Sequence, residues 1–523
     1  MLLPHIRFSY MFLVLAACFG LLYALQLLGI GTDLIRPDLM RSLHISLMLY
    51  GFVPLMMTLL PFALFDKEGI LHAGSLRNLE RFLWLWYIFL VFMILSILAG
   101  VTRGLPFYDF AYELNAILAL AGLFYIAALI QNVRNYPKVP RWVKVSLFLV
   151  IISPLALLIL MNPQYGQVEK MLQGPHGDNT LGMSFALVVI YYLVIKLSSE
   201  KISFETKWHF LWQIPLAGYA VSVLCRIFVG TLSYNAEWFF QYLTLLYVPL
   251  LYRWWKDAGL SIAKNRLLFI SIAAFLFADV EGNILFIPSL RHLFHRNDLV
   301  VGHAHVAVGI GLLFLALAII KPYMSVGRYK AYFWALMLSL MAVVLSISGI
   351  EQAGFADMHT EKLWECRALF GALFLAGLLY RPTGIGTDYL RRWVHTWNTI
   401  TLYNAAGFLS DGVGGVLLLL FGKALYDMAG IPFAPGYQQI VFGFVAAVGA
   451  IHLMGVLYPR YGEASARATV LARIVTAAGF FALYKNGTFG WIGAFICMTD
   501  LLFVLVYLIF IKKEPSYEKN DMD

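Results

Sequence analysis

Residues 299–318 read LVVGHAHVAVGIGLLFLALA, and this stretch decides the fold class. It is long and apolar enough to cross a bilayer as a helix, which takes about 20 residues. The whole chain has the same character, since 61% of its 523 residues are hydrophobic and 13% are charged. A soluble domain is about half apolar and about a quarter charged. We therefore expect an all-α polytopic protein embedded in a lipid bilayer.

Similar apolar runs recur along the chain and predict about 16 membrane spans. They fall at residues 8–30, 39–66, 80–101, 110–132, 143–162, 178–198, 207–230, 235–254, 265–288, 298–321, 331–350, 364–380, 394–422, 436–458, 467–484 and 488–511. Lys and Arg concentrate in loops after even-numbered spans, which places these loops and both termini in the cytoplasm. The net charge of +9 reflects this topology and does not indicate nucleic-acid binding.

Histidines inside the predicted spans are the first functional signal, because ionisable groups in a membrane usually face a partner inside the bundle. His303 and His305 lie just inside the tenth span from the outer side, and His44 lies at a similar depth in the second. Residues two apart on an α-helix are separated by about 200°. The pair is therefore expected to serve two metals, and imidazole is a common axial ligand of heme iron.

Two hemes beside the tenth span are the resulting prediction, with His44 completing a bis-histidine site with one of the pair. Gly302, Ala304 and Ala307 would let flat macrocycles approach, although small residues serve helix packing equally well. His395 and His452, near or inside later spans, are interpreted as buried hydrogen-bonding residues, with a ligand role as the alternative. No CxxCH motif occurs, so no covalently attached heme is expected.

Several motifs resemble the catalytic subunit of the heme-copper oxidase superfamily, above all the cbb-type oxidases and nitric oxide reductases. They are RSLHISLM at 41–48, VEGNILFIPSLRHLFHRNDLVVGHAHVAVGIG at 280–311, ECRALFGALFLAG at 365–377 and, more weakly, TRGLPFYDF at 102–110. The resemblance covers residues 1–385 and implies a twelve-helix core. Residues 386–523 would add about four transmembrane helices.

The resemblance also implies roles for individual residues. His44 and His305 would ligate the low-spin heme b, and His303 would ligate the high-spin heme b. Glu281 would face the reaction chamber or line a proton route. Two residues, His295 and Asp298, would lie near heme propionates, and Asp109 would take the place of a calcium ligand.

The second metal site departs from the superfamily, which uses one histidine on the sixth helix and an adjacent pair on the seventh. This sequence has no HH pair. In GPHGDNTLG, residues 174–182, Asp178 takes the ligand position and His176 lies two residues earlier. A site built from Asp178 and Glu281, with or without His176, is rich in oxygen and suits non-heme iron better than copper. Asp178 could equally be a helix N-cap, and without a second metal Arg226 would supply a fixed positive charge.

The resemblance implies a respiratory oxidoreductase of the prokaryotic inner (cytoplasmic) membrane, with its hemes toward the outer side. Acidic metal ligands favour reduction of nitric oxide to nitrous oxide over reduction of oxygen. An oxygen-reducing terminal oxidase, a diheme electron carrier or sensor without the second metal, and a heme-free transporter are the alternatives. The substrate would be a small gas, and electrons would come from a cytochrome c-type partner subunit or from quinol.

Overall fold

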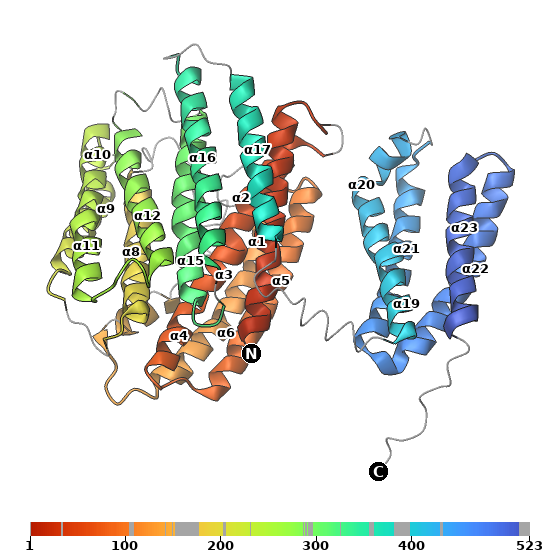
Figure 1. The fold of residues 1–523 in the computed structure, drawn as a ribbon, viewed down its shortest axis with the longest axis horizontal. Helices are drawn as coiled ribbons and strands as arrows, with labels where there is room; N and C mark the ends of the chain where they lie inside the picture. The colour runs from red at the N-terminus through yellow and green to blue at the C-terminus, as the bar shows by residue number, and fades with distance from the viewer. Residues whose placement is uncertain are drawn as a thin grey trace. The chain divides into compact units, whose positions relative to one another are not determined.

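The structure is a computed structural model of the chain. It describes residues 2–32, 35–103, 109–141, 143–148, 150–151, 177–201, 206–230, 232–285, 287, 290, 297–324, 326–354, 360–380, 398–428 and 432–511. All regular secondary structure in these residues is helical (Figure 1). Within them, 11 helices are long and apolar enough to cross a membrane. The prediction of an all-α integral membrane protein is confirmed.

The chain divides into two compact units, Met1–Ile385 and Gly386–Asp523. The first unit contains α1 (Leu2–Leu27), α2 (Pro37–Tyr50), α3 (Phe52–Thr58), α4 (Leu60–Lys67), α5 (Ala73–Leu98), η1 (Tyr112–Leu114), α6 (Asn115–Val133), α8 (Gly177–Ser198), α9 (Phe210–Phe228), α10 (Tyr234–Tyr242), η3 (Leu243–Leu246), α11 (Tyr247–Asp257), α12 (Arg266–Leu285), α14 (Asp298–Ala304), η4 (His305–Leu312), α15 (Leu313–Ile320), α16 (Arg328–Gln352) and α17 (Thr360–Leu379).

Five of the predicted spans have no membrane-length apolar helix among the described residues. Four of them, at 178–198, 207–230, 235–254 and 364–380, are nevertheless helical. The last is α17, whose first half carries Glu361, Lys362, Glu365 and Arg367, which explains its lower apolarity. The fifth, at 143–162, lies mostly outside the described residues.

The second predicted span is one continuous stretch, Pro37–Lys67, divided into α2, α3 and α4. The first break is at Gly51, three residues before Pro54. Proline has no N–H for the carbonyl one turn earlier, which here belongs to Tyr50. Trp86 of α5 donates its Nε1–H to that carbonyl at 2.7 Å. The break is thus stabilised by a neighbouring helix.

The helix that carries the histidine pair is formed by α14, η4 and α15 in succession, and η4 is a π-helix. It packs on α12 on one side and on α16 on the other. Glycines allow the approach to α16: a Cβ on Gly302 would lie 2.8 Å from the Ala342 carbonyl oxygen, and one on Gly349 would lie 2.3 Å from the Leu299 nitrogen. Small residues permit such backbone contacts between membrane helices.

The second unit contains α19 (Thr399–Gly407), η5 (Phe408–Val413), α20 (Gly414–Met428), α21 (Pro435–Leu457), η6 (Pro459–Tyr461), α22 (Gly462–Lys485), α23 (Gly490–Val506) and η7 (Tyr507–Ile511). The segment η5 is also a π-helix and packs closely on α21. A Cβ on Gly449 would lie 2.0 Å from the Gly412 nitrogen, so only glycine fits at this crossing.

Candidate functional site

His44 of α2 and His305 of η4 face each other in the first unit. Their ring centroids are 6.2 Å apart and their planes differ by 24°. An imidazole nitrogen bonds a transition metal at about 2.0 Å, and the ring centroid lies about 1 Å behind it, so two axial imidazoles on one ion have centroids about 6 Å apart. The observed separation fits one metal ion held between the two rings.

The protonation of both rings is fixed by backbone carbonyls. His44 Nδ1 lies 2.8 Å from the Ala16 oxygen, and His305 Nδ1 lies 2.8 Å from the Val301 oxygen. A carbonyl oxygen only accepts, so each Nδ1 must carry the proton and each Nε2 keeps its lone pair. Metal-bound histidines are held in this way, with the other ring nitrogen donating to a carbonyl or carboxylate. Both rings are therefore set to ligate through Nε2.

Gly20 makes the contact between His44 and α1 possible. It lies one helical turn after Ala16, and a Cβ there would lie 2.6 Å from Nδ1 and 2.8 Å from Cε1 of His44. The missing side chain leaves the space through which the imidazole reaches the Ala16 carbonyl. The position of the ring thus depends on a glycine that the histidine spacing did not reveal.

His303 faces a different helix from His305. Its Nδ1 lies 3.3 Å from Oε2 of Glu281 on α12, and both side chains are partly exposed. The adjacent Gly282 permits this approach, since a Cβ there would lie 3.2 Å from His303 Cε1. The Glu281-Gly282 pair therefore has a physical explanation: the glycine admits the ring and the glutamate contacts Nδ1. That contact leaves the Nε2 lone pair available to a metal ion.

Arg367 of α17 is a buried cation close to the histidine pair. It is 8% exposed and acts electrostatically on both His44 and His305. Its guanidinium lies 5.5 Å from the Tyr23 ring and is stabilised at longer range by the charge of Asp298, but it makes no direct hydrogen bond or ion pair with any residue that the structure describes. A buried charge requires a partner. The site can therefore accept an anionic group such as a heme propionate.

Asp298 joins the start of α14 to two neighbouring helices. Its Oδ2 accepts hydrogen bonds from Ser348 at 2.6 Å, Gln352 at 2.9 Å and Trp364 at 2.7 Å. It also acts electrostatically on Arg367. Asp298 therefore fixes the start of the helix that carries His303 and His305.

Asp109 accepts hydrogen bonds from two parts of the first unit. Ser42 donates to its Oδ2, and the Arg103 backbone N–H donates to its Oδ1 at 2.8 Å. Since Ser42 lies two residues before His44, Asp109 supports the helix that carries this histidine. The calcium role predicted for Asp109 stays a prediction.

The predicted second metal site falls largely on residues without a structural description. His176 and His295 lie outside the described residues, and Asp178 lies in the first turn of α8, where side chains are not described. Arg226 is likewise described only in its backbone. Among the described side chains, no three His, Cys, Asp or Glu residues form a group that could hold a metal ion.

One further residue near His303 was not predicted from the sequence. Asp279 lies two residues before Glu281, and its Oδ2 is buried without a hydrogen-bond partner in the described part of the chain. The Asp279 carboxyl interacts electrostatically with His303. It lies on the same helix face as Asn283, whose Nδ2 donates to the Thr244 hydroxyl at 3.0 Å. A carboxylate in an apolar span is itself a functional signal, and it was available in the sequence ADVEGN.

No protein-family model matches this chain, and no curated protein sequence is significantly similar to it. The resemblance to heme-copper oxidases therefore depends on its motifs alone. The geometry around His44, His303 and His305 provides separate physical grounds for a function.

Proposed function

We propose that the first unit holds two b-type hemes and acts as a membrane-bound respiratory reductase that converts nitric oxide to nitrous oxide. The observation that carries the proposal is the His44–His305 pair, with centroids 6.2 Å apart and both Nδ1 atoms bonded to backbone carbonyls. Both imidazoles would hold one low-spin heme, which would transfer electrons without binding substrate. His303, facing another helix, would hold the high-spin heme.

The hemes, when bound, would supply one-electron redox chemistry and a coordination position for the gas. The chain supplies orientation and charge. Glu281 accepts a hydrogen bond from His303 Nδ1, which would make Nε2 of this ring a stronger ligand for a heme iron. Arg367 provides a buried positive charge for a propionate, and Asp298 fixes the start of α14.

Proton delivery is the second requirement of this reaction, because two molecules of nitric oxide need two electrons and two protons to yield nitrous oxide and water. Asp279 is suited to carry a proton, since its Oδ2 is buried and unpartnered among the described residues. Glu281, at 3.3 Å from His303 Nδ1, is better suited to positioning that ring than to lining the chamber.

The remaining parts of the proposal follow from the sequence. A non-heme iron held by Asp178 and His176 would complete the catalytic site, and copper is less suited to such ligands. Both termini would be cytoplasmic in a prokaryotic inner membrane, with the hemes toward the outer side. A cytochrome c-type subunit or quinol would supply the electrons.

The test is metal analysis and optical spectroscopy of the purified chain. We expect two b-type hemes, additional non-heme iron and turnover of nitric oxide. Oxygen turnover instead would identify a terminal oxidase, and two hemes without non-heme iron or turnover would identify an electron carrier or sensor. A heme-free protein would exclude all three.

Two histidine variants separate the two heme sites. His303→Ala should remove the high-spin spectrum and keep the bis-histidine spectrum, whereas His305→Ala should do the reverse. His72→Asn is the matched control, because His72 caps α5 through its side chain and asparagine can accept the same hydrogen bond. Equal loss of both spectra in His303→Ala would contradict the assignment of the pair to two different irons.

A further inference from the structure

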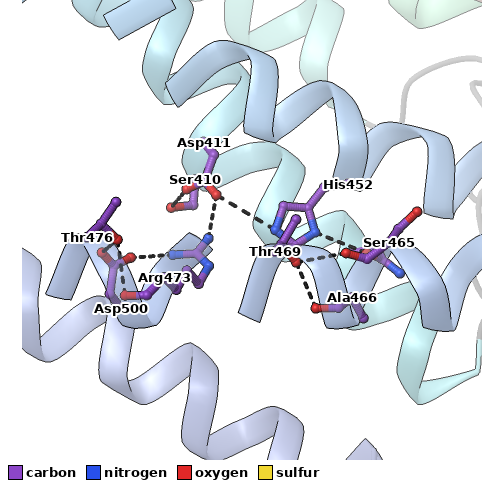
Figure 2. A network of polar contacts seen from close by, with 10 residues as sticks. Ser410, Asp411, His452, Ser465, Ala466, Thr469, Arg473, Thr476 and Asp500 are labelled. Carbon is purple, nitrogen blue, oxygen red and sulfur yellow. Dashed lines mark hydrogen bonds and ion pairs between the residues drawn. The ribbon is translucent and has the colours of Figure 1, made fainter. Parts of the chain in front are cut away.

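The second unit contains a buried network of ionisable side chains, shown in Figure 2. Asp411 of η5, Arg473 of α22 and Asp500 of α23 are 9%, 3% and 9% exposed, and His452 of α21 is fully buried. These residues come from four different elements inside apolar helices. Ionisable groups in such positions are costly and usually functional. His452 is confirmed as a buried hydrogen-bonding residue, but the rest of the network was not predicted.

The charges of the network do not balance. Arg473 donates from Nη2 to Asp411 Oδ2 and from Nη1 to Asp500 Oδ1, each at 2.7 Å. Asp500 Oδ2 accepts from Thr476 at 2.6 Å, and Asp411 Oδ1 accepts from Ser410 at 2.9 Å. With both carboxylates ionised, the single guanidinium leaves the network with a net charge of −1. An uncompensated buried charge is unfavourable, so the network favours binding one positive charge.

The position for that charge follows from the hydrogen bonds of Asn404. Both protons of its Nδ2 are used, by the Ile400 oxygen at 3.1 Å and the Gly462 oxygen at 2.9 Å. Its Oδ1 must therefore accept from His452 Nδ1 at 3.0 Å. The neutral ring then carries its proton on Nδ1 and a lone pair on Nε2.

His452 Nε2 is buried without a hydrogen-bond partner among the described residues, and it lies 3.7 Å from Asp411 Oδ2. Two acceptors thus face each other across a short gap in the interior of the bundle. A proton on Nε2 would turn this contact into a charge-assisted hydrogen bond and bring the network to neutrality. A metal cation would instead prefer a shell of oxygen ligands, and a nitrogen occupies one side of this gap.

We propose that Asp411 and His452 form a reversible proton-binding site, which makes the second unit a proton-carrying module. One proton from water bonds to His452 Nε2, the imidazolium pairs with Asp411, and release of the same proton restores the neutral ring. The Arg473–Asp500 ion pair stays in place in both states. This proton-binding site needs neither a heme nor a second metal.

Besides Asp411, the charged and titratable groups around His452 are Arg473, whose charge acts on the ring, and Tyr403, whose ring centroid lies 5.7 Å from that of His452.

The backbone is shaped to hold His452 in this position. A Cβ on Gly407 would lie 2.3 Å from both Cε1 and Nε2 of the ring. The edge of the ring that carries the free nitrogen thus lies directly against a glycine of α19. Gly407 of α19 thus leaves the space that the imidazole ring of His452, on α21, occupies.

The experiment is pH-difference infrared spectroscopy of the full chain, labelled with ¹⁵N-histidine and reconstituted in liposomes. The sample is titrated between about pH 5 and about pH 8, where histidine can change its charge. We expect one component of the histidine protonation signal to be lost in both Asp411→Asn and His452→Gln, while the signals of the other histidines remain. Glu463→Gln, which removes an exposed ion pair with Arg467 in the same unit, should keep the full signal.

Three results would overturn the proposal. The first is a wild-type difference spectrum identical to that of His452→Gln, in which the signals of the other histidines show that the variant is intact. The second is a signal that Asp411→Asn and His452→Gln both retain. The third is a signal that follows sodium concentration at constant pH, which would identify a metal-cation site.

Discussion

Gly20→Ala adds one methyl group where the His44 ring meets α1. The new Cβ would lie 2.6 Å from Nδ1, whereas ordinary contact begins at 3.4 Å, so the ring must retreat by roughly 0.8 Å. That retreat breaks the 2.8 Å hydrogen bond to Ala16, which contributes about 1 kcal/mol. Loss of a hydrogen bond that orients a metal ligand lowers metal affinity by about 10- to 100-fold. If the pair holds the proposed low-spin heme, we expect Gly20→Ala to lose this heme faster by a similar factor.

The assay follows transfer of heme from the purified protein to an excess of an apo-globin acceptor. Gly371→Ala is the matched control, because it adds the same methyl group to a helix of the same unit and meets its nearest atoms at 3.8 Å. This control should release heme at the wild-type rate. If Gly20→Ala also released heme at that rate, with an unchanged bis-histidine spectrum, the Ala16 carbonyl would not be what orients His44.

Three further predictions concern single side chains of the first unit. Glu281→Gln should weaken binding of the proposed high-spin heme by about 10-fold or more and raise its midpoint potential, because the carboxylate no longer strengthens His303 as a ligand. Redox titration of both hemes measures this effect, and an equal shift of both midpoint potentials would contradict it. Arg367→Met should weaken heme retention if the guanidinium pairs with a propionate, whereas higher thermal stability with unchanged heme content would show that the charge has no anionic partner. Lys67→Met should lower the free energy of unfolding by about 2 kcal/mol in a denaturation assay, because the ammonium donates to three carbonyls at the end of α8. Lys67→Arg should retain most of this stability in the same assay.

The fold class could be predicted because each span carries its own signal. Membrane insertion depends on about 20 consecutive apolar residues, so length and composition suffice for spans such as Leu2–Leu27 and Arg328–Gln352. The criterion was less effective for α17, whose charged first half serves the bundle interior through Arg367. A span that contains a charged residue for the bundle interior is necessarily less apolar than a span whose residues all face lipid.

The histidine pair could be predicted because helical rise converts sequence position into depth. His44 and His305 lie at similar distances from the ends of their spans, and the structure brings their ring centroids to 6.2 Å from each other. The partner of Glu281 could not be predicted in this way, because depth does not specify azimuth. Whether its carboxylate faces a chamber or the Nδ1 of His303 depends on how α12 packs on α14, and Gly282 sets that distance.

The network of the second unit is harder still to predict from sequence. Asp411 and Arg473 are separated by 62 residues, and Arg473 and Asp500 by 27. Each residue alone is compatible with a local role, such as Asp411 accepting from its neighbour Ser410. Only the packing of four helices shows that two carboxylates share one guanidinium and that a neutral imidazole faces one of them.

Both candidate sites lie at a π-helical segment, and this has a common physical reason. A π-turn inserts one residue into a helix, which rotates everything after it by about 100° relative to a continuous α-helix. All eight residues of α15, which follows η4, are buried. The turns before α15 instead direct His303 toward α12 and His305 toward α2. The extra residue lets the two halves of one span satisfy different neighbours. In the second unit, η5 likewise lies between two α-helical segments, α19 and α20. Asn404 of α19 faces α21, and η5 places Asp411 within reach of both His452 and Arg473.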